Sequence, residues 1–329
     1  MSSNADHSAT PALPPHDPND PVENAVIRRL AGNWHRRASV KREEPDLDDL
    51  FQHERPDYPE ALLPFHDHPT YQALPPEKRN ELLSWGWIAF NRHTVMVEQK
   101  LANPAFALVV EGEYPDIQGE AMNTALAQAM VDEQYHTLMH LNASAVTRRQ
   151  RGGGLRDSDL PMPHLVREHQ RLRDSAEERW QRSLTTLAFA TVTEISIVAY
   201  LSLIVDNPDI QPINSTTVKI HNRDEYCHSS ITAELAEMVH SKLNAAQRRF
   251  FLDHLAKGLD GFVTNDYASW DRVMDLSRIE GGHEMLADCR AESSRQRLVC
   301  DYSGLRGLAE RLDVVEQLDI DWSQSVATG

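Results

Sequence analysis

Two copies of one short motif place a carboxylate and an imidazole at helical spacing. Residues 132–136 and 224–228 both read Asp-Glu-x-x-His. On a helix, side chains three or four residues apart share a face, so the Glu and His of each copy could bind one transition-metal ion. His221 lies four residues before the Glu of the second copy and adds a third donor to that face. The repeated motif predicts metal-ligand chemistry rather than two polar helix surfaces.

Two further carboxylates stand inside apolar stretches. Glu98 follows a run rich in Leu, Trp and Val, and Glu194 lies near the middle of the strongly apolar segment 187–204. A buried carboxylate without a partner is costly unless it is neutralised or bound to a metal. For Glu98 alone, an exposed carboxylate remains an alternative. In chain order the six residues are Glu98, Glu133 with His136, Glu194, and Glu225 with His228. This is the ligand order of ferritin-like bundles that hold two metal ions.

Four long helices must carry these side chains. Apolar periodicity, with breaks at Pro and Gly, predicts an all-α protein, a ferritin-like four-helix bundle core with additional covering helices. We expect core helices at about 75–110, 117–149, 165–204 (where a kink is allowed) and 215–243. A first helix is expected at about 21–40, and covering helices at about 245–274, 283–296 and 303–313.

The remaining segments set the domain boundaries. Residues 1–21 are rich in Pro, Ser, Asp and Asn and are expected to form a disordered tail. Residues 41–74 are acidic and rich in Pro, which predicts an extended connector. No boundary separates the core helices, so residues 22–322 are expected to form a single domain, followed by a loose tail at 323–329.

Composition narrows the class of protein. The chain has 329 residues, a net charge of −17 and three cysteines without Cys-x-x-Cys spacing. The negative charge argues against binding nucleic acid, and the cysteine usage fits a reducing cytoplasm. No signal-peptide pattern is present. The segment 187–204 is short for a membrane span and contains Glu194, so a helix buried inside the fold is the better interpretation.

Other polar residues could support the metal ligands. Asp132 and Asp224 directly precede the two motif glutamates and should point toward neighbouring helices. We interpret them as acceptors for the distal ring nitrogens of ligand histidines, with solvated helix charges as an equal alternative. His140, one turn beyond His136, is either a hydrogen-bond partner of the site or a core histidine. Candidate substrate-pocket walls, for which plain core packing is the alternative, are Asn91, Thr94, Val95, Leu187, Thr191 and Val198.

With His221 included, the last motif reads His-x3-Glu-x2-His, and the chain resembles the di-iron arylamine N-oxygenases typified by p-aminobenzoate N-oxygenase. The resemblance covers about residues 22–313. Stretches that match include Asn91–Phe106, Asp132–His140 and Arg297–Gly304. By this resemblance the metal ligands are Glu98, Glu133, His136, Glu194, His221, Glu225 and His228.

The resemblance also implies an activity. Two Fe ions would use O2 to oxidise an aromatic amine through hydroxylamine and nitroso stages to a nitro group, in antibiotic or other secondary-metabolite biosynthesis. The chain shows no nucleotide or flavin fingerprint, so electrons would come from an external donor, a ferredoxin or a reductase. A homodimer is the family expectation, and the cytoplasm is the location expected from the cysteine usage. Manganese stays open because the same ligand types suit it.

Two positions depart from the aminobenzoate-oxidising pattern. Cys300 stands where that pattern has an Arg suited to pairing with a substrate carboxylate, and Phe90 stands where it has a Tyr. A neutral or larger arylamine, such as a chloramphenicol-type precursor, is therefore the preferred substrate hypothesis. Two alternatives to N-oxygenation remain: a di-iron C–H hydroxylase acting on a carrier-bound substrate, and a ferritin-type iron-storage protein.

Overall fold

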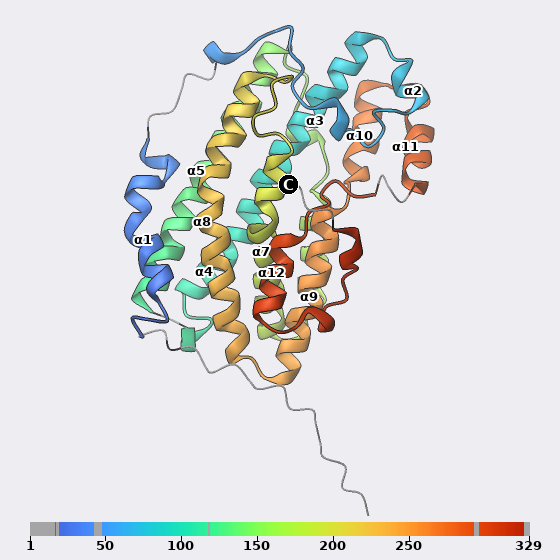
Figure 1. Ribbon diagram of the computed structural model, residues 1–329. Helices are drawn as coiled ribbons and strands as arrows, with labels where there is room; N and C mark the ends of the chain where they lie inside the picture. Colours follow the sequence, from blue (N-terminus) through green and yellow to red (C-terminus); the bar gives the residue numbers. More distant parts are fainter. Residues whose placement is uncertain (1–16, 18–19, 43–47, 118, 293–295, 326–329) are drawn as a thin grey trace, which may run out of the picture.

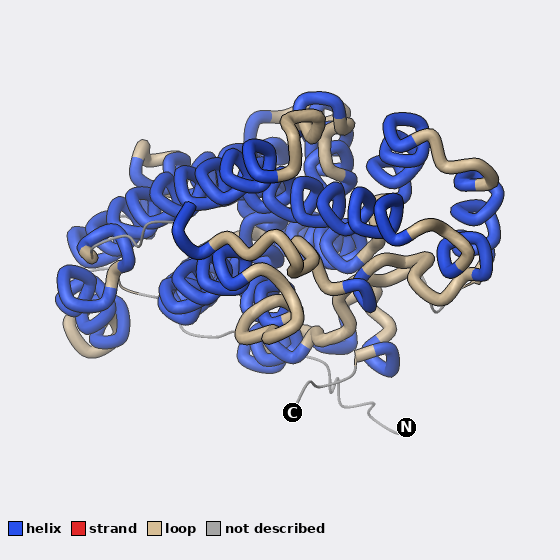
Figure 2. The backbone as a smooth tube through the Cα atoms, turned by 90° about the horizontal axis from the view of Figure 1, so that it is seen from above, coloured by secondary structure: helices blue, strands red, loops and turns tan. Residues whose placement is uncertain are grey.

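Helices dominate the part of the chain that the computed structural model describes, which is residue 17 and residues 20–42, 48–117, 119–292 and 296–325. Within these residues the only β-type pairing is one isolated bridge between Thr264 and Arg297. Figure 2, seen from above, shows helices and connecting loops alone. The predicted all-α class is confirmed.

Four long helical elements form the centre of the molecule (Figure 1). In chain order they are α3 (Pro76–Val97) continued through η4 (Glu98–Ala102) into α4 (Asn103–Val110), α5 (Glu120–Gln150), α7 (Arg179–Ser202) and α8 (Pro212–Lys242). They pack in a closed ring: the α3–η4–α4 element contacts α5, α5 contacts α8, α8 contacts α7, and α7 contacts the α3–η4–α4 element. Proline occupies the first position of α3 and α8, where its missing N–H costs nothing.

The element η4 is a single π-helical turn that begins at Glu98. The N–H of Asn103 bonds to the carbonyl of Glu98, five residues earlier, instead of the usual four. Pro104 follows and has no N–H to offer to the carbonyl of Lys100, so an ordinary α-helical bond is unavailable there. The sequence predicted an unbroken helix up to residue 110. The wider turn sits at a candidate ligand, and π-turns frequently occur at functional sites.

The remaining helices cover this core. Helix α1 (Ala25–Arg37) and the 3₁₀ turn η1 (Ser39–Lys41) lie against α5 and α8. Three helices pack on α7: α6 (His164–Asp174), α9 (Ala245–Val263) and α12 (Ser303–Arg311). At the upper right of Figure 1, α10 (Tyr267–Ser277) contacts α3 and α11 (Gly282–Ala291), and α11 contacts α2 (Pro69–Gln72).

Two predicted helices are divided in the structure. The segment 165–204 forms α6 and α7, because Glu178 and Gln181 make a reciprocal capping box that starts a new helix. The segment 245–274 forms α9 and α10, because Thr264 leaves the helix in an extended conformation and pairs with Arg297. Only α7, and not α6, carries a candidate ligand, so the break leaves the site intact.

The connector expected at 41–74 is not simply extended. Residues 43–47 lie outside the described residues, but the remainder contains short helical turns, including α2. Tyr58, Leu63 and Phe65 are fully or almost fully buried in the core. Their apolar side chains, rather than the local Pro content, decide that this segment packs on the bundle.

At the chain ends, most of the predicted N-terminal tail and residues 326–329 lie outside the description. Ser325 Oγ accepts a hydrogen bond from the N–H of Tyr302 (3.0 Å), so the start of the tail expected at 323–329 contacts the body of the protein.

Helix α7 is long and apolar enough to span a membrane by length and composition, but 89% of its most apolar window is buried inside the fold. It is a core helix here, as the sequence analysis expected. Its burial removes the side chain of Glu194 from solvent, with only 2% of that residue exposed.

Candidate metal centre

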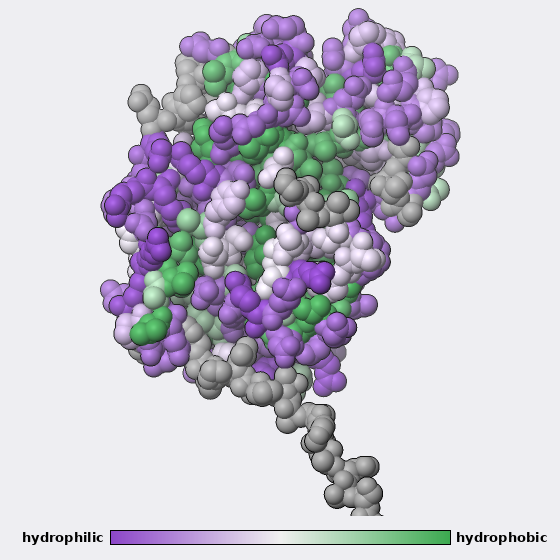
Figure 3. All heavy atoms as spheres, in the orientation of Figure 1, coloured by the Kyte–Doolittle hydropathy of each residue, from purple (hydrophilic) through white to green (hydrophobic). Residues whose placement is uncertain are grey.

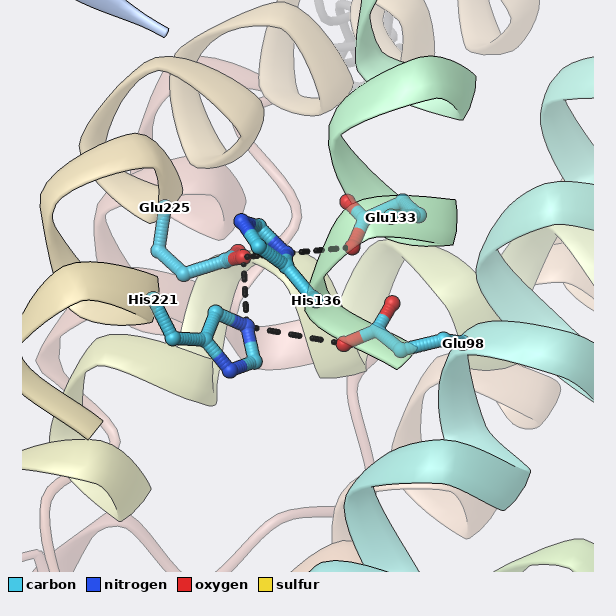
Figure 4. A group of neighbouring side chains, drawn as sticks. All are labelled: Glu98, Glu133, His136, His221 and Glu225. Carbon is cyan, nitrogen blue, oxygen red and sulfur yellow. Dashed lines mark hydrogen bonds and ion pairs between the residues drawn. The ribbon is translucent and has the colours of Figure 1, made fainter. Parts of the chain in front are cut away.

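All seven predicted ligand side chains are buried at the centre of the bundle. Figure 4 shows five of them pointing toward a common point from three different helical elements. Glu98 is only 2% exposed, so it is not the surface carboxylate that its local sequence allowed. The seven come from all four core elements: Glu98 from η4, Glu133 and His136 from α5, Glu194 from α7, and His221, Glu225 and His228 from α8.

The ligand atoms form two overlapping groups, and within each group they lie within 4.8 Å of one another. Glu133 and Glu225 belong to both groups, so their carboxylates are placed to bridge two metal ions. The five other side chains each face one position. The first group is Glu98, Glu133, His136, His221 and Glu225, and the second is Glu133, Glu194, Glu225 and His228.

Unpartnered atoms show that metal ions fit this arrangement. Among the described residues, Glu98 Oε2, Glu133 Oε1, Glu194 Oε2 and His228 Nδ1 are buried without a hydrogen bond. His228 Nδ1 and Glu133 Oε1 lie 2.7 Å apart, yet their directions do not make a hydrogen bond. Buried polar atoms nearly always have a partner. Buried carboxylate and imidazole atoms that converge in this way are a donor set that suits Fe or Mn ions.

Protons are unevenly distributed over the carboxylates. Burial, followed by the charge of Glu133, raises the pKa of Glu98 and of Glu194 well above the usual value. Burial acts the same way on Glu133 and Glu225, but the neighbouring histidines, His228 first, outweigh it and hold both pKa values below the usual range. These directions favour negative charge on Glu133 and Glu225 and protons on Glu98 and Glu194, which a bound metal ion would displace.

Each motif aspartate supports the histidine of the other motif. Asp132 Oδ2 accepts a hydrogen bond from His228 Nε2 (3.2 Å), and Asp224 Oδ2 accepts one from His136 Nε2 (3.3 Å). The Nδ1 atom of each histidine faces the carboxylates of the centre. Burial alone would raise the pKa of Asp224, but the hydrogen bonds from His136 and Ser39 lower it below its usual value. Such contacts orient a ligand imidazole and define its tautomer.

His221 is held differently, by a buried chain of side chains. Asn91 donates through Nδ2 to the carbonyl of Trp87 (2.6 Å), so its Oδ1 accepts from His140 Nδ1 (2.7 Å). His140 Nε2 then accepts from His221 Nδ1 (2.8 Å). This order of donors leaves the lone pair of His221 Nε2 toward the centre, 2.8 Å from Glu225 Oε1 and 3.5 Å from Glu98 Oε1. His140 therefore bonds to a candidate ligand, and Asn91 orients His140.

Sequence reasoning missed the contribution of the α1 region. The indole Nε1 of Trp34 donates to both carboxylate oxygens of Asp132 (3.0 and 2.9 Å). The backbone N–H of Ser39 donates to both oxygens of Asp224 (3.3 and 3.1 Å). Arg37 NH1 also approaches Asp132 Oδ2, at 3.7 Å. Trp34 lies in the helix expected at about 21–40, and nothing in the local sequence indicates that its side chain meets Asp132.

A cavity of about 70 Å³, which we call the Phe90 cavity, lies beside α3 and α7. Its lining includes Phe90, Arg92, His93 and Tyr200. The Phe90 ring stacks on Tyr200 (centroids 4.8 Å apart), and its centroid is 6.1 Å from the ring of His140. Phe90 therefore separates this cavity from the hydrogen-bonded chain that holds His221.

The other predicted pocket residues do not line the Phe90 cavity. Thr94 bonds to the carbonyl of Phe90 (3.2 Å). Cys300 is exposed, and its segment reaches the cavity through Leu298 instead. The side chains buried in the core are Asn91, Thr94, Val95, Leu187 and Thr191, and Val198 is partly buried. Helical periodicity predicted which of these residues share a helix face, but not which residues line the cavity.

Residues 20–313 match the family described as P-aminobenzoate N-oxygenase AurF. The chain belongs to this family. It is also 33% identical over 307 residues to a 4-aminobenzoate N-oxygenase from Streptomyces thioluteus, covering 92% of this chain and 90% of the relative. The family predicted from the sequence is confirmed.

One solved structure is similar over most of its length. It is an R2-like ligand-binding oxidase mutant with an aerobically reconstituted Mn/Fe cofactor, 15% identical, with 91% of this chain and 93% of the other covered. The TM-score is 0.32, which does not by itself establish a common fold. The helical bundle and the buried ligand groups described above are the observations that indicate a two-metal centre.

Proposed function

We propose that this member of the N-oxygenase family is a non-haem di-iron enzyme that oxidises an aromatic amine with O2. The product sequence is hydroxylamine, nitroso and nitro compound. The observation that carries the proposal is the pair of overlapping, fully buried ligand groups in a chain of this family. Bound iron would supply the activation of O2 and the transfer of oxygen to the amine nitrogen.

The protein's own residues would position the two ions and keep water away. Glu133 and Glu225 would bridge them, and a carboxylate can change between bridging and terminal binding as the charge at the centre changes. One ion would also be held by Glu98, His136 and His221, and the other by Glu194 and His228. The apolar surroundings of α7 exclude bulk water from the centre, which strengthens the interaction of each carboxylate with a cation.

We propose a neutral arylamine as the substrate. We propose that the Phe90 cavity receives the substrate. Among its lining residues Arg92 is already engaged, because it donates to the carbonyl of Pro161 (3.0 Å) and lies 3.9 Å from Asp157. Burial lowers the pKa of His93 to about 4, so its imidazole is neutral near pH 7. Phe90 itself lacks a hydroxyl. These features favour an uncharged aromatic ring over p-aminobenzoate, the type of substrate named for the Streptomyces relative.

The biological setting extends the proposal. We infer that residues 22–322 act as one domain, in a cytoplasmic homodimer that receives electrons from an external ferredoxin or reductase. A role in antibiotic or secondary-metabolite biosynthesis is part of the same proposal. The resemblance of the motifs to those of the family supports it, and gel filtration with light scattering tests the homodimer.

The decisive experiment loads the protein with iron, reduces it without air and mixes it with O2, with and without a panel of arylamines. We expect a transient visible absorbance that decays faster with neutral arylamines, and nitro products by mass spectrometry. Saturable turnover of p-aminobenzoate at a comparable rate would overturn the substrate proposal. An absorbance change indifferent to every amine would favour C–H hydroxylation, and simple oxidation and retention of iron would favour storage.

A matched pair of variants controls this experiment. Glu225→Ala removes a carboxylate placed to bridge, whereas Glu234→Ala removes one from the same helix outside both ligand groups. We expect the first to abolish the absorbance change and product formation and the second to retain both. Metal analysis of the purified protein then identifies the ion, including manganese.

A further inference from the structure

One partly exposed aromatic residue is connected to the centre through side-chain hydrogen bonds. Trp34 of α1 is half-buried, and its Nε1–H donates to Asp132 (3.0 and 2.9 Å). Asp132, which is fully buried, accepts in turn from Nε2 of His228 (3.2 Å). Two consecutive hydrogen bonds therefore form a continuous path from the partly exposed Trp34 to His228, a residue of the second ligand group.

Asp224, the counterpart of Asp132 in the second motif, is held by a different kind of group. Asp224 is held by the backbone N–H of Ser39, and Ser39 is 1% exposed. A backbone amide would orient Asp224 as well as an indole orients Asp132. The need to orient Asp132 therefore does not explain why its partner is the ring of a partly exposed tryptophan, Trp34.

The surface around Trp34 carries positive charge in an otherwise acidic protein. The segment Ala25–Arg42 contains six Arg and Lys residues and no Asp or Glu, although the whole chain has a net charge of −17. The Lys41 ammonium lies 4.7 Å from the centre of the Trp34 ring. Figure 3 shows a hydrophilic surface at the upper left edge, where the C-terminal part of α1 lies in Figure 1.

We call this region the α1 surface; its exposed cations are Arg28, Arg29, Arg36, Lys41 and Arg42. Within the part of the chain that the structure describes, none of these five forms an ion pair with an acidic side chain. The chain becomes acidic again directly after Arg42, at residues that lie outside the description. An unpaired cationic surface attracts and orients an acidic partner.

We propose that the α1 surface docks an acidic one-electron carrier of the 2Fe–2S ferredoxin class, and that electrons reach the centre through Trp34, Asp132 and His228. This inference rests on the proposed function, because an oxygenase without a bound flavin or nicotinamide requires an external donor. Charge complementarity favours a small acidic protein over a symmetric contact between two copies of this chain, because both α1 surfaces would carry the same charge.

Electrons would travel along this route one at a time. Each reduced ferredoxin would give up one electron and be oxidised, and that electron would reduce one bound ferric ion to ferrous. Two ferredoxin molecules, docking in turn, would supply the electrons for both ions. The indole, carboxylate and imidazole conduct by tunnelling and keep their own oxidation and protonation states. In the first oxidation, one arylamine, one O2, two electrons and two protons yield one hydroxylamine and one water.

The first test measures the anaerobic reduction of the iron-loaded, ferric protein by a reduced, acidic plant-type 2Fe–2S ferredoxin in a stopped-flow instrument. We expect Trp34→Phe, which keeps an aromatic ring but removes the N–H, to slow this reduction roughly tenfold, a typical size for the loss of an outer-shell contact. Trp180→Phe is the matched control, because Trp180 also donates to a carboxylate, Glu178 (2.7 Å), but on another helix. Equal rates for both variants would overturn the route.

The second test measures docking independently of catalysis. Calorimetric titration with the same ferredoxin should give an affinity that falls as salt is raised. Arg36→Glu combined with Lys41→Glu should weaken binding by roughly tenfold or more, which is about 1.4 kcal/mol. Arg171→Glu combined with Arg173→Glu, a basic pair on α6, is the control. Equal weakening by both pairs, or binding insensitive to salt, would overturn the docking surface.

A peroxide-driven reaction separates failure of the route from failure of the proposed function. Arylamine and H2O2 yield hydroxylamine and water without any electron donor. In Trp34→Phe, the ratio of the ferredoxin-driven to the peroxide-driven rate should fall roughly tenfold. A parallel loss of both rates would make Trp34 a support for Asp132 only and overturn the route. If the unmodified protein oxidises no arylamine with either peroxide or O2, the proposed function fails, whereas ferredoxin docking and iron reduction are still measured.

Discussion

The half-bundle of η4 and α5 and the half-bundle of α7 and α8 contribute the same basic set of ligands to the centre. Each provides one Glu from one helix and a Glu-x-x-His pair from the next. Each motif aspartate crosses to the histidine of the opposite half. Because every half needs the other to orient its histidine, the two halves form one unit rather than two independent metal sites.

The halves differ where the repetition is broken. α8 carries His221, whose counterpart on α5, four residues before Glu133, is Ala129. The first half has a π-turn at Glu98, whereas Glu194 lies in an ordinary α-helix. One ion would therefore have two histidine ligands and the other one. The shared set would hold two ions, and the departures would make the two ions chemically unequal.

The largest loss of bound metal should follow substitution of the carboxylates common to both ligand groups. Glu133→Ala or Glu225→Ala should remove both ions, because each residue belongs to both groups. Glu194→Ala should remove only the ion of the second group. Iron per chain, measured by mass spectrometry, distinguishes these outcomes. Loss of only one ion from Glu225→Ala would show that this carboxylate is terminal, and Glu234→Ala should change nothing.

The next largest effect, on Fe(II) affinity, should come from His221, the histidine without a counterpart on α5. His221→Ala makes α8 resemble α5 at this position and should weaken one of two Fe(II) binding steps by more than the roughly 10- to 100-fold typical of outer-shell changes. The other step should change little, because His221 belongs to the first group only. Anaerobic calorimetric titration measures both steps. Equal weakening of the two steps would mean that the groups do not act separately.

A smaller effect tests the crossed aspartates. Asp132→Asn and Asp224→Asn should each lower Fe(II) affinity by roughly 10- to 100-fold, since each removes the anion that orients one histidine. The variants should affect opposite binding steps, because Asp132 contacts His228 and Asp224 contacts His136. If both variants weakened the same step, the assignment of histidines to separate ions would be wrong.

The smallest effect concerns pH. The raised pKa values of Glu98 and Glu194 mean that metal binding must displace their protons. Lowering the pH keeps those protons in place, so Fe(II) affinity should fall as pH falls and rise as pH rises. Titration in buffers of different ionisation enthalpy counts the protons released. Glu98→Ala should release about one proton fewer than the unmodified protein, and an unchanged count would show that Glu98 is already ionised.

Helical periodicity carried much of the prediction. The core helices and the four carboxylates they bury could be predicted because residues three and four apart share a face whatever lies across from it. The two extra helix breaks, at Glu178 and Thr264, could not be placed with the same assurance. A capping box competes with a continuous helix at similar local energy, and the packing of α6 and α9 on α7 decides between them.

The sequence by itself determined the ligand types, their order and the helices that bear them, because these depend on residues close together in the chain. Tertiary structure alone decided that Glu133 and Glu225 are shared and that each aspartate serves the opposite histidine. It also brought Trp34 to Asp132, 98 residues away, and Phe90 to the wall of a cavity. Such relations depend on distances between helices, which no local pattern encodes.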